Sequence, residues 1–147
     1  MATYEFWTHG VDTVVEFPNR AAEVRHAGWG TLIRQAAGTD NWFHIAIPSA
    51  KIINNPAKMR EIRLRAEVNE CARIDLIHFR DDGKLIFSKA VSFTNGIVDE
   101  VFQSDDLPIE GGISLCIHDV PKWLMLGTHH GPKCRWRLPD LRRATSV

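Results

Sequence analysis

The sequence predicts an all-β fold, an antiparallel β-sandwich with jelly-roll-like connectivity, and three observations indicate it. Apolar residues recur at every second position in several segments, which is the period of a strand with one buried face. About nine such segments follow one another at short intervals, and most are separated by Gly, Pro, Asn or Asp. Strong helical segments are missing between them, which disfavours the crossover helices of a parallel sheet.

Length and composition indicate one ordinary globular unit. The chain has 147 residues, of which 44% are hydrophobic and 24% charged. A chain of this length folds around one core, so we expect a single domain over residues 1–147, with 127–147 as a less regular C-terminal extension. Eighteen basic residues balance eighteen acidic ones. No net charge therefore attracts nucleic acid or an anionic membrane, and neither is expected as a partner.

The number of cysteines and the N-terminal sequence indicate the cellular compartment in which the protein is expected. Cys71, Cys116 and Cys134 are too few for a disulfide framework and are interpreted as thiols of a reducing environment. Residues 1–10 lack the basic and apolar regions of a signal peptide. No segment approaches the roughly eighteen apolar residues of a membrane-spanning helix. A cytoplasmic protein with no membrane span is the default expectation.

The N-terminal half contains four segments that read as strands, separated by breakers at Pro18-Asn19, Gly38 and Pro48. The expected strands cover residues 4–7, 11–17, 29–33 and 42–47. Between them, residues 21–26 fit a helical turn or a strand equally well.

The most regular alternation lies in residues 62–68, where apolar side chains occupy every second position and polar ones fill the gaps. Helix formers are also frequent from Met59 to Val68. A helix, however, would need Arg63 to be apolar and would leave Leu64 on the wet side. The pattern therefore favours a strand.

Turn signals divide the rest of the chain. Asp81-Asp82-Gly83 predicts a tight hairpin, because Asp-Gly tolerates positive φ angles, and Asn95-Gly96 predicts a second turn. Gly111-Gly112 introduces a strand over 113–118. The remaining expectations are a corner at Val120-Pro121, a short apolar run over 123–126 and an edge strand over 135–138.

The densest cluster of aromatic and turn residues lies between Gly28 and Pro48. If residues 42–47 form a strand, Phe43, Ile45 and Ile47 lie on the core face. Trp42 and His44 then share the opposite face.

Two motifs in this region carry a family resemblance. Gly-Trp-Gly-Thr at 28–31, followed by Gly-Thr-x-Asn-Trp-Phe-His-x-x-Ile-Pro at 38–48, resembles a bacterial family of small β-sandwich proteins of unknown function. The likeness is most specific over 28–48 and fades to a general strand pattern by about residue 126. The resemblance implies a compact sandwich and carries no assigned activity.

Trp42 and His44 are the leading candidates for a ligand-binding surface. An aromatic ring offers a platform for a flat ligand such as a sugar, and His44 and Asn41 supply hydrogen bonds. Trp29 is a further candidate aromatic residue. The alternative is a second apolar face that the other sheet or a loop covers, since large aromatic side chains mostly serve packing.

Metal binding and catalysis receive little support. Cys116, His118, His129 and His130 are weak candidates for a tetrahedral zinc site, but no established zinc motif is present. No nucleophile elbow and no phosphate loop occurs. Asp81-Asp82 and Asp105-Asp106 are interpreted as turn residues. No catalytic residue and no cofactor is expected.

The sequence favours a non-catalytic binding or interaction module that recognises a small ligand, a glycan or a protein. A self-associating component of a homo-oligomeric assembly is the second hypothesis, because sheet edges are ready interfaces. An enzyme with an unrecognised site is the third.

Overall fold

The computed structural model describes residues 3–49, 57–121 and 136–146, so the expectations for 123–126, Cys134, His129 and His130 lie outside the described residues. In this part the chain forms eleven strands and two 3-10 turns and contains no helix long and apolar enough to cross a membrane. The strands are β1 (Thr3–His9), β2 (Val14–Val15), β3 (Ala21–Ala27), β4 (Gly30–Gln35), β5 (Asn41–Ile47), β6 (Lys58–Val68), β7 (Ala72–Asp81), β8 (Lys84–Phe93), β9 (Gly96–Pro108), β10 (Ile113–Pro121) and β11 (Trp136–Ser146). The turns are η1 (Gly10–Asp12) and η2 (Pro18–Arg20).

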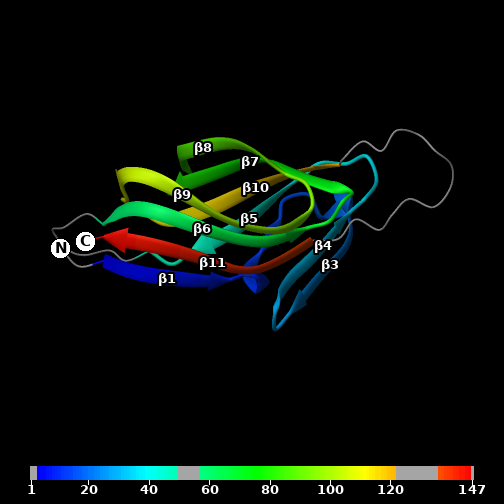
Figure 1. The fold of residues 1–147 in the computed structure, drawn as a ribbon, viewed down its shortest axis with the longest axis horizontal. Helices are drawn as coiled ribbons and strands as arrows, with labels where there is room; N and C mark the ends of the chain where they lie inside the picture. The colour runs from blue at the N-terminus through cyan, green and yellow to red at the C-terminus, as the bar shows by residue number, and fades with distance from the viewer. Residues whose placement is uncertain (1–2, 50–56, 122–135, 147) are drawn as a thin grey trace.

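The strands form two antiparallel sheets packed as layers (Figure 1). Sheet A has the order β3-β4-β11-β6-β9, with β1 also paired to β11, and sheet B has the order β2-β5-β10-β7-β8. If the eight strands from β4 to β11 are numbered 1 to 8, the sheets read 1-8-3-6 and 2-7-4-5, which is the order of a jelly roll. The predicted antiparallel sandwich is confirmed.

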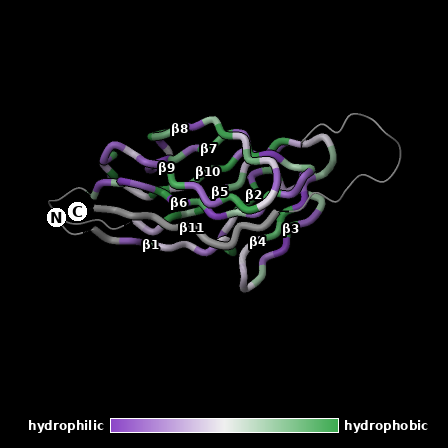
Figure 2. Tube along the Cα trace, viewed as in Figure 1, coloured by the Kyte–Doolittle hydropathy of each residue, from purple (hydrophilic) through white to green (hydrophobic). Residues whose placement is uncertain are grey.

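The core lies between the sheets because most strands alternate apolar and polar side chains. Figure 2 shows this alternation along the chain. Phe43, Ile45 and Ile47 are buried as expected, and Leu115 and Ile117 of the neighbouring strand β10 lie beside them on the same face. Burial of apolar surface contributes roughly 25 cal/mol per Å². This term therefore sets which face of each strand points inward.

The segment 62–68 is a strand, as its alternation predicts, and a bulge modifies the N-terminal end of β6. Relative to β11, Arg60 is an extra residue in β6, because Ala144 pairs with Glu61 and Thr145 with Met59. An extra residue shifts the alternation by one position. Met59 and Ile62 are therefore both fully buried, although three positions separate them.

The expected edge strand over 135–138 is wrong. Residues 136–138 of β11 pair with β4 on one side, and β11 pairs with β6 on the other, so this strand lies inside sheet A. Pro139 cannot donate a backbone hydrogen bond, and it falls where the β11–β6 register shifts, between Arg137 and Asp140. The irregularity lets a proline sit in an interior strand.

The N-terminal half differs from expectation at two places. Only Val14 and Val15 of the predicted strand 11–17 pair as a strand, since η1 includes residues 11–12 and residues 13, 16 and 17 belong to no strand. Residues 21–26, which fit a helical turn or a strand equally well, form a strand, because β3 pairs with β4 in sheet A.

The loop between β9 and β10 is held against the predicted β7–β8 hairpin, which the structure confirms. The buried carboxylate of Asp81 accepts hydrogen bonds from the backbone N–H groups of Glu110 and Gly111, at 2.7 and 2.9 Å. The loop approaches the hairpin closely at Gly111, because a Cβ atom there would lie 2.7 Å from the Cβ of Asp82. A Cβ atom on Gly112 would meet nothing within 4 Å.

Gly111→Ala should therefore destabilise the fold by about 1–3 kcal/mol, because the new methyl group forces this loop away from Asp82. Gly112→Ala is the matched control and should change stability by less than about 0.5 kcal/mol. Urea denaturation followed by circular dichroism measures both. Equal stabilities for the two variants would contradict the close approach.

Candidate functional site

Strand register gathers the candidate residues on the outer face of sheet B. In β5, β10 and β7, His44 pairs with Cys116 and Cys116 with His78, so these three residues form a row across the sheet. In the next row, Trp42 pairs with His118. Directly opposite residues of antiparallel strands have Cβ atoms about 4.5–5.5 Å apart. Two imidazoles therefore flank the Cys116 thiol.

Trp42 lies over this face and borders a hollow. Its ring centroid is 4.8 Å from that of His78 and 4.6 Å from that of His118, and both ring pairs are tilted. The hollow has a volume of about 310 Å³. We call it the Trp42 hollow, and its lining residues are Glu16, Trp42, His44, His78, Arg80 and Cys116. Trp42 is half-buried, so part of its ring faces the hollow.

Two carboxylates hold His118 beside Trp42. Nδ1 of His118 lies 2.7 Å from Oδ1 of Asp75, and Nε2 lies 3.3 Å from Oδ2 of Asp40. Asp75 is an extra residue in β7 relative to β10, because His118 pairs with Leu76 and Asp119 with Ile74. Bulges commonly redirect a side chain in this way. The hydrogen bond from His118 lowers the pKa of Asp40, and the charge of Arg20 adds to the effect.

His44 connects a carboxylate to the thiol. Nε2 of His44 lies 2.7 Å from Oε2 of Glu16, and Cys116 is opposite His44 in the neighbouring strand. Hydrogen bonding to the Cys116 side chain raises the pKa of His44; burial opposes this rise, and Glu16 reinforces it. The positively charged imidazolium is thus favoured at this position.

His78 has the opposite electrostatic setting. Its pKa is lowered, first by burial and then by the positive charges of Arg80 and His118. Neutral imidazole is therefore favoured at His78, with one nitrogen as donor and the other as acceptor. Arg80 donates to the carbonyl of Gly83 at 2.9 Å, so its guanidinium is held near the β7–β8 turn.

The structure separates the four expected ligand-binding residues. Trp42 and His44 lie together at the Trp42 hollow, on the same face, as the alternation predicts. Asn41 is fully buried, and its amide bonds the backbone of Phe17 at 2.9 and 3.0 Å. Trp29 lies in the turn of the β3–β4 hairpin, which belongs to sheet A (Figure 1).

Asn41 nevertheless acts on the site through the chain segment that it holds. Its contacts with Phe17, and the backbone hydrogen bond from Glu16 N–H to the Trp42 carbonyl at 2.9 Å, attach residues 16–17 to β5. Glu16 is thereby placed against His44. Asn41 thus positions the residue that contacts His44.

The metal candidates do not form a group in the described part of the chain. Cys116 and His118 lie on one face, as their spacing predicts, but no set of three His, Cys, Asp or Glu residues among the described ranges is arranged to hold a metal ion. His129 and His130 fall outside those ranges.

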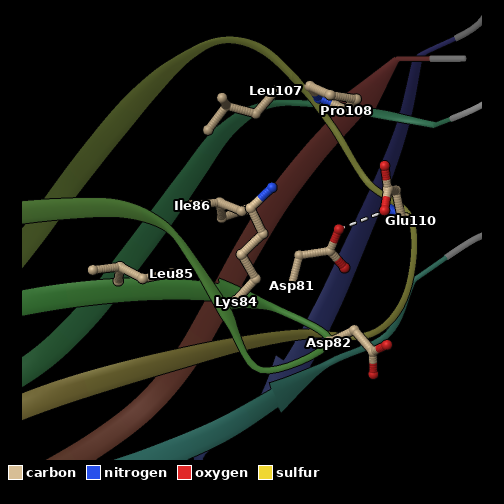
Figure 3. Close-up of a pocket in the computed structure, with 8 residues that line it drawn as sticks. All are labelled: Asp81, Asp82, Lys84, Leu85, Ile86, Leu107, Pro108 and Glu110. Atoms are coloured by element: carbon tan, nitrogen blue, oxygen red, sulfur yellow. Dashed lines mark hydrogen bonds between the residues drawn. The ribbon is translucent and has the colours of Figure 1, made fainter.

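A larger hollow of about 460 Å³ lies at the β7–β8 hairpin (Figure 3). Three of its lining residues are acidic: Asp81, Asp82 and Glu110. The Asp81 carboxylate points toward Glu110 and accepts its backbone N–H, so it stabilises the loop. The Trp42 hollow, in contrast, combines an aromatic ring, two imidazoles and a thiol.

Sequence reasoning missed most partners of Trp42 and His44. Glu16, Asp40, Asp75, His78 and Arg80 come from three other segments of the chain. The sequence does indicate that His78 and Arg80 share the outer face of their strand, since they alternate with the buried Ile77 and Phe79. No local pattern indicates which strands become neighbours.

We expect His44 to titrate above the ordinary histidine pKa of about 6.5, and His78 below it, because His44 lies beside Cys116 and Glu16 whereas His78 is partly buried beside positive charge. NMR titration of the imidazole resonances measures both values. Glu16→Gln should lower the pKa of His44 and leave that of His78 unchanged. Since folding raises the pKa of His44, its contribution to stability is fully present below about pH 6.5 and is lost as pH rises through the folded-state pKa. A His44 midpoint at or below that of His78 would contradict the described contacts.

Solved structures with a similar arrangement come from different kinds of protein. The family 35 carbohydrate binding module from Clostridium thermocellum has a TM-score of 0.48 at 7% identity, over 97% of this chain and 98% of that chain. CBM35 from Paenibacillus barcinonensis has a TM-score of 0.44 at 16% identity, over 96% of both chains. A structure of infectious bursal disease virus, Gx strain, has a TM-score of 0.46 at 16% identity, over 99% of this chain and 32% of that chain. At these identities no residue role is carried across.

Comparison with curated proteins finds no match. A family model matches residues 1–82, which is more than half of the 147 residues. The match covers the motif region 28–48, while the bacterial origin and the motif itself stay predictions. The chain belongs to a family of unknown function (DUF6623).

Proposed function

We propose that this chain is a non-catalytic binding module that holds a small polar ligand, a sugar residue of a glycan, in the Trp42 hollow. One observation carries the proposal. Trp42 is half-buried at the border of a hollow whose other lining residues are mostly polar or charged. A sugar ring has an apolar face and a rim of hydroxyl groups, and this combination of aromatic and polar groups complements both.

The polar groups around Trp42 supply both donors and acceptors. Arg80 offers N–H donors, Glu16 offers carboxylate oxygens, and neutral His78 offers one of each. His118 contacts Trp42 and is itself held by Asp75 and Asp40. The orientation of the Trp42 ring is therefore supported. A rigid aromatic platform reduces the entropy lost when a ligand binds.

The size of the hollow supports a ligand of about one ring. Its volume of about 310 Å³ is at the small end of the range for ligand sites, about 300–1,000 Å³. A glycan would place one residue against Trp42 and extend over the outer face of sheet B.

Tryptophan fluorescence and isothermal titration with a panel of neutral, acidic and amino sugars and their oligomers test the proposal. At least one member should bind, and Trp42→Ala should weaken its binding at least tenfold, about 1.4 kcal/mol, because the platform is removed. Trp29→Ala is the matched control, since this exposed tryptophan lies on sheet A. No binding across the panel, or equal losses in both variants, would count against the site.

Self-association is a second candidate, and β9 favours it. Within the described residues β9 lies at the end of sheet A, where it pairs with β6. It also carries Ile97 and Val101, whose exposed fractions are 86% and 40%. Unpaired edge strands with apolar side chains are ready interfaces.

If β9 mediates association, a sizing column at micromolar concentration should give a discrete oligomer, and Ile97→Lys should convert it to monomer because a charge opposes burial of the edge. Leu85→Lys, at an exposed position of β8, is the control. A monomer at all concentrations would remove this candidate.

A further inference from the structure

Beyond the contacts that the binding proposal uses, three groups of the Trp42 hollow form an arrangement of their own. Glu16, His44 and Cys116 all line it. The Glu16 carboxylate lies 2.7 Å from Nε2 of His44, and Cys116 is opposite His44 on the next strand. An acid that orients an imidazole, which in turn lies beside a thiol, is the general arrangement that activates a nucleophile.

The imidazole has a defined orientation. A carboxylate only accepts hydrogen bonds, so Nε2 of His44 carries the proton shared with Glu16. The second ring nitrogen is then the one that exchanges a proton with a thiol. The pKa of His44 is raised, first by Cys116 and further by Glu16, which favours the imidazolium that forms when the ring takes the proton.

Cys116 is nearly closed off from solvent but borders the hollow. Its residue surface is 2% exposed, yet it lines the hollow. The charged and titratable groups that line the hollow with it are Glu16 from the segment after β2, His44 from β5, and His78 and Arg80 from β7.

We propose that Cys116 is a thiol modification site, at which Glu16 and His44 activate the sulfur to react with a small-molecule disulfide that enters the Trp42 hollow. This inference does not depend on glycan binding. It assigns a covalent chemistry to a face for which the proposed function needs only contacts.

The reaction is a thiol–disulfide exchange. The proton of the Cys116 thiol passes to His44, and the thiolate attacks one sulfur of the disulfide R–S–S–R. A bond forms between Sγ of Cys116 and that sulfur, while the R–S–S–R bond breaks and its electron pair leaves on the second sulfur. The released thiolate takes the proton from His44. Cys116 is oxidised to a mixed disulfide and one R–S group is reduced to R–SH.

Exchange fits the site better than acyl transfer does. Acyl transfer needs backbone or side-chain donors aimed at a developing oxyanion. Cys116 is in the interior of β10, which pairs with β5 and β7 on its two sides, so the backbone around it is engaged in the sheet. Exchange at sulfur needs no such donors.

The test is the rate of reaction with hydroxyethyl disulfide between pH 5.5 and 8.5, in buffer with a chelator, followed by mass spectrometry of the intact chain and of its peptides. Cys71 is the internal comparison, since it is buried to a similar degree, with 3% exposed. Cys71→Ala with Cys134→Ser isolates Cys116, and Cys116→Ala with Cys134→Ser isolates Cys71. Cys116 should react at least about tenfold faster than Cys71 at pH 7.

The pH dependence of the reaction rate distinguishes activation of the Cys116 thiol by His44 from mere access of the reagent to the sulfur. The rate of an ordinary thiol with a pKa of about 8.5 falls about tenfold per pH unit below that value. The rate at Cys116 should fall less steeply than this, because His44 takes the thiol proton. His44→Gln should lower the rate at pH 7 about tenfold and restore the ordinary slope, and Glu16→Gln should act in the same direction to a smaller extent. His26→Gln, on β3, is the matched control and should change neither quantity.

Equal rates at Cys116 and Cys71, or an ordinary slope in the wild-type chain, would overturn the proposal. An unchanged rate and slope in His44→Gln would also overturn it. If circular dichroism shows that His44→Gln fails to fold, the wild-type pH profile and the comparison with Cys71 still decide. These readouts are independent of sugar binding, so failure here leaves the proposed function standing, and the reverse also holds.

Discussion

The pairing of β10 between β5 and β7 is the constraint on which the rest of the site depends. Leu115 and Ile117 must face the core, and successive side chains of a strand point to opposite faces. Cys116 and His118 are therefore forced outward. A slip of one residue would expose the apolar pair to water and bury the polar pair. The free energy that holds the core thus also holds the row of His44, Cys116 and His78.

The outer face of sheet B carries polar groups that are partly removed from water, and such groups must be paired. His118 satisfies this requirement through Asp75 and Asp40, and His44 does so through Glu16. Both arrangements use irregular backbone, namely the bulge at Asp75 and the short non-strand segment at Glu16. These irregularities interrupt the regular strand pairing at the two places where a carboxylate reaches a histidine of the outer face. His78 and Arg80 line the hollow beside these paired groups.

Local pattern predicts strands well in this chain because burial on one face repeats every second residue. The strand over 62–68 and the inward trio of β5 follow from it directly. The pattern says less about how many neighbours a strand has. An arginine-rich, proline-containing segment resembles an edge strand, yet β11 lies between β6 on one side and β4 and β1 on the other. A register irregularity at Pro139 accommodates the missing donor, and no feature of the local sequence indicates it.

The sequence by itself determined the strand character of the chain, the inward and outward faces of β5, and the shared face of Trp42 and His44, because these depend only on the order of neighbouring residues. Only the tertiary structure decided which residues meet them. His118 reaches Asp40 across 78 positions of the chain, and His44 reaches Glu16 across 28. Trp29, close to Trp42 in sequence, lies in a turn between two strands of the other sheet. Pairing between strands is a non-local choice made by the burial of the whole core, so the composition of the hollow is decided only when both sheets are assembled.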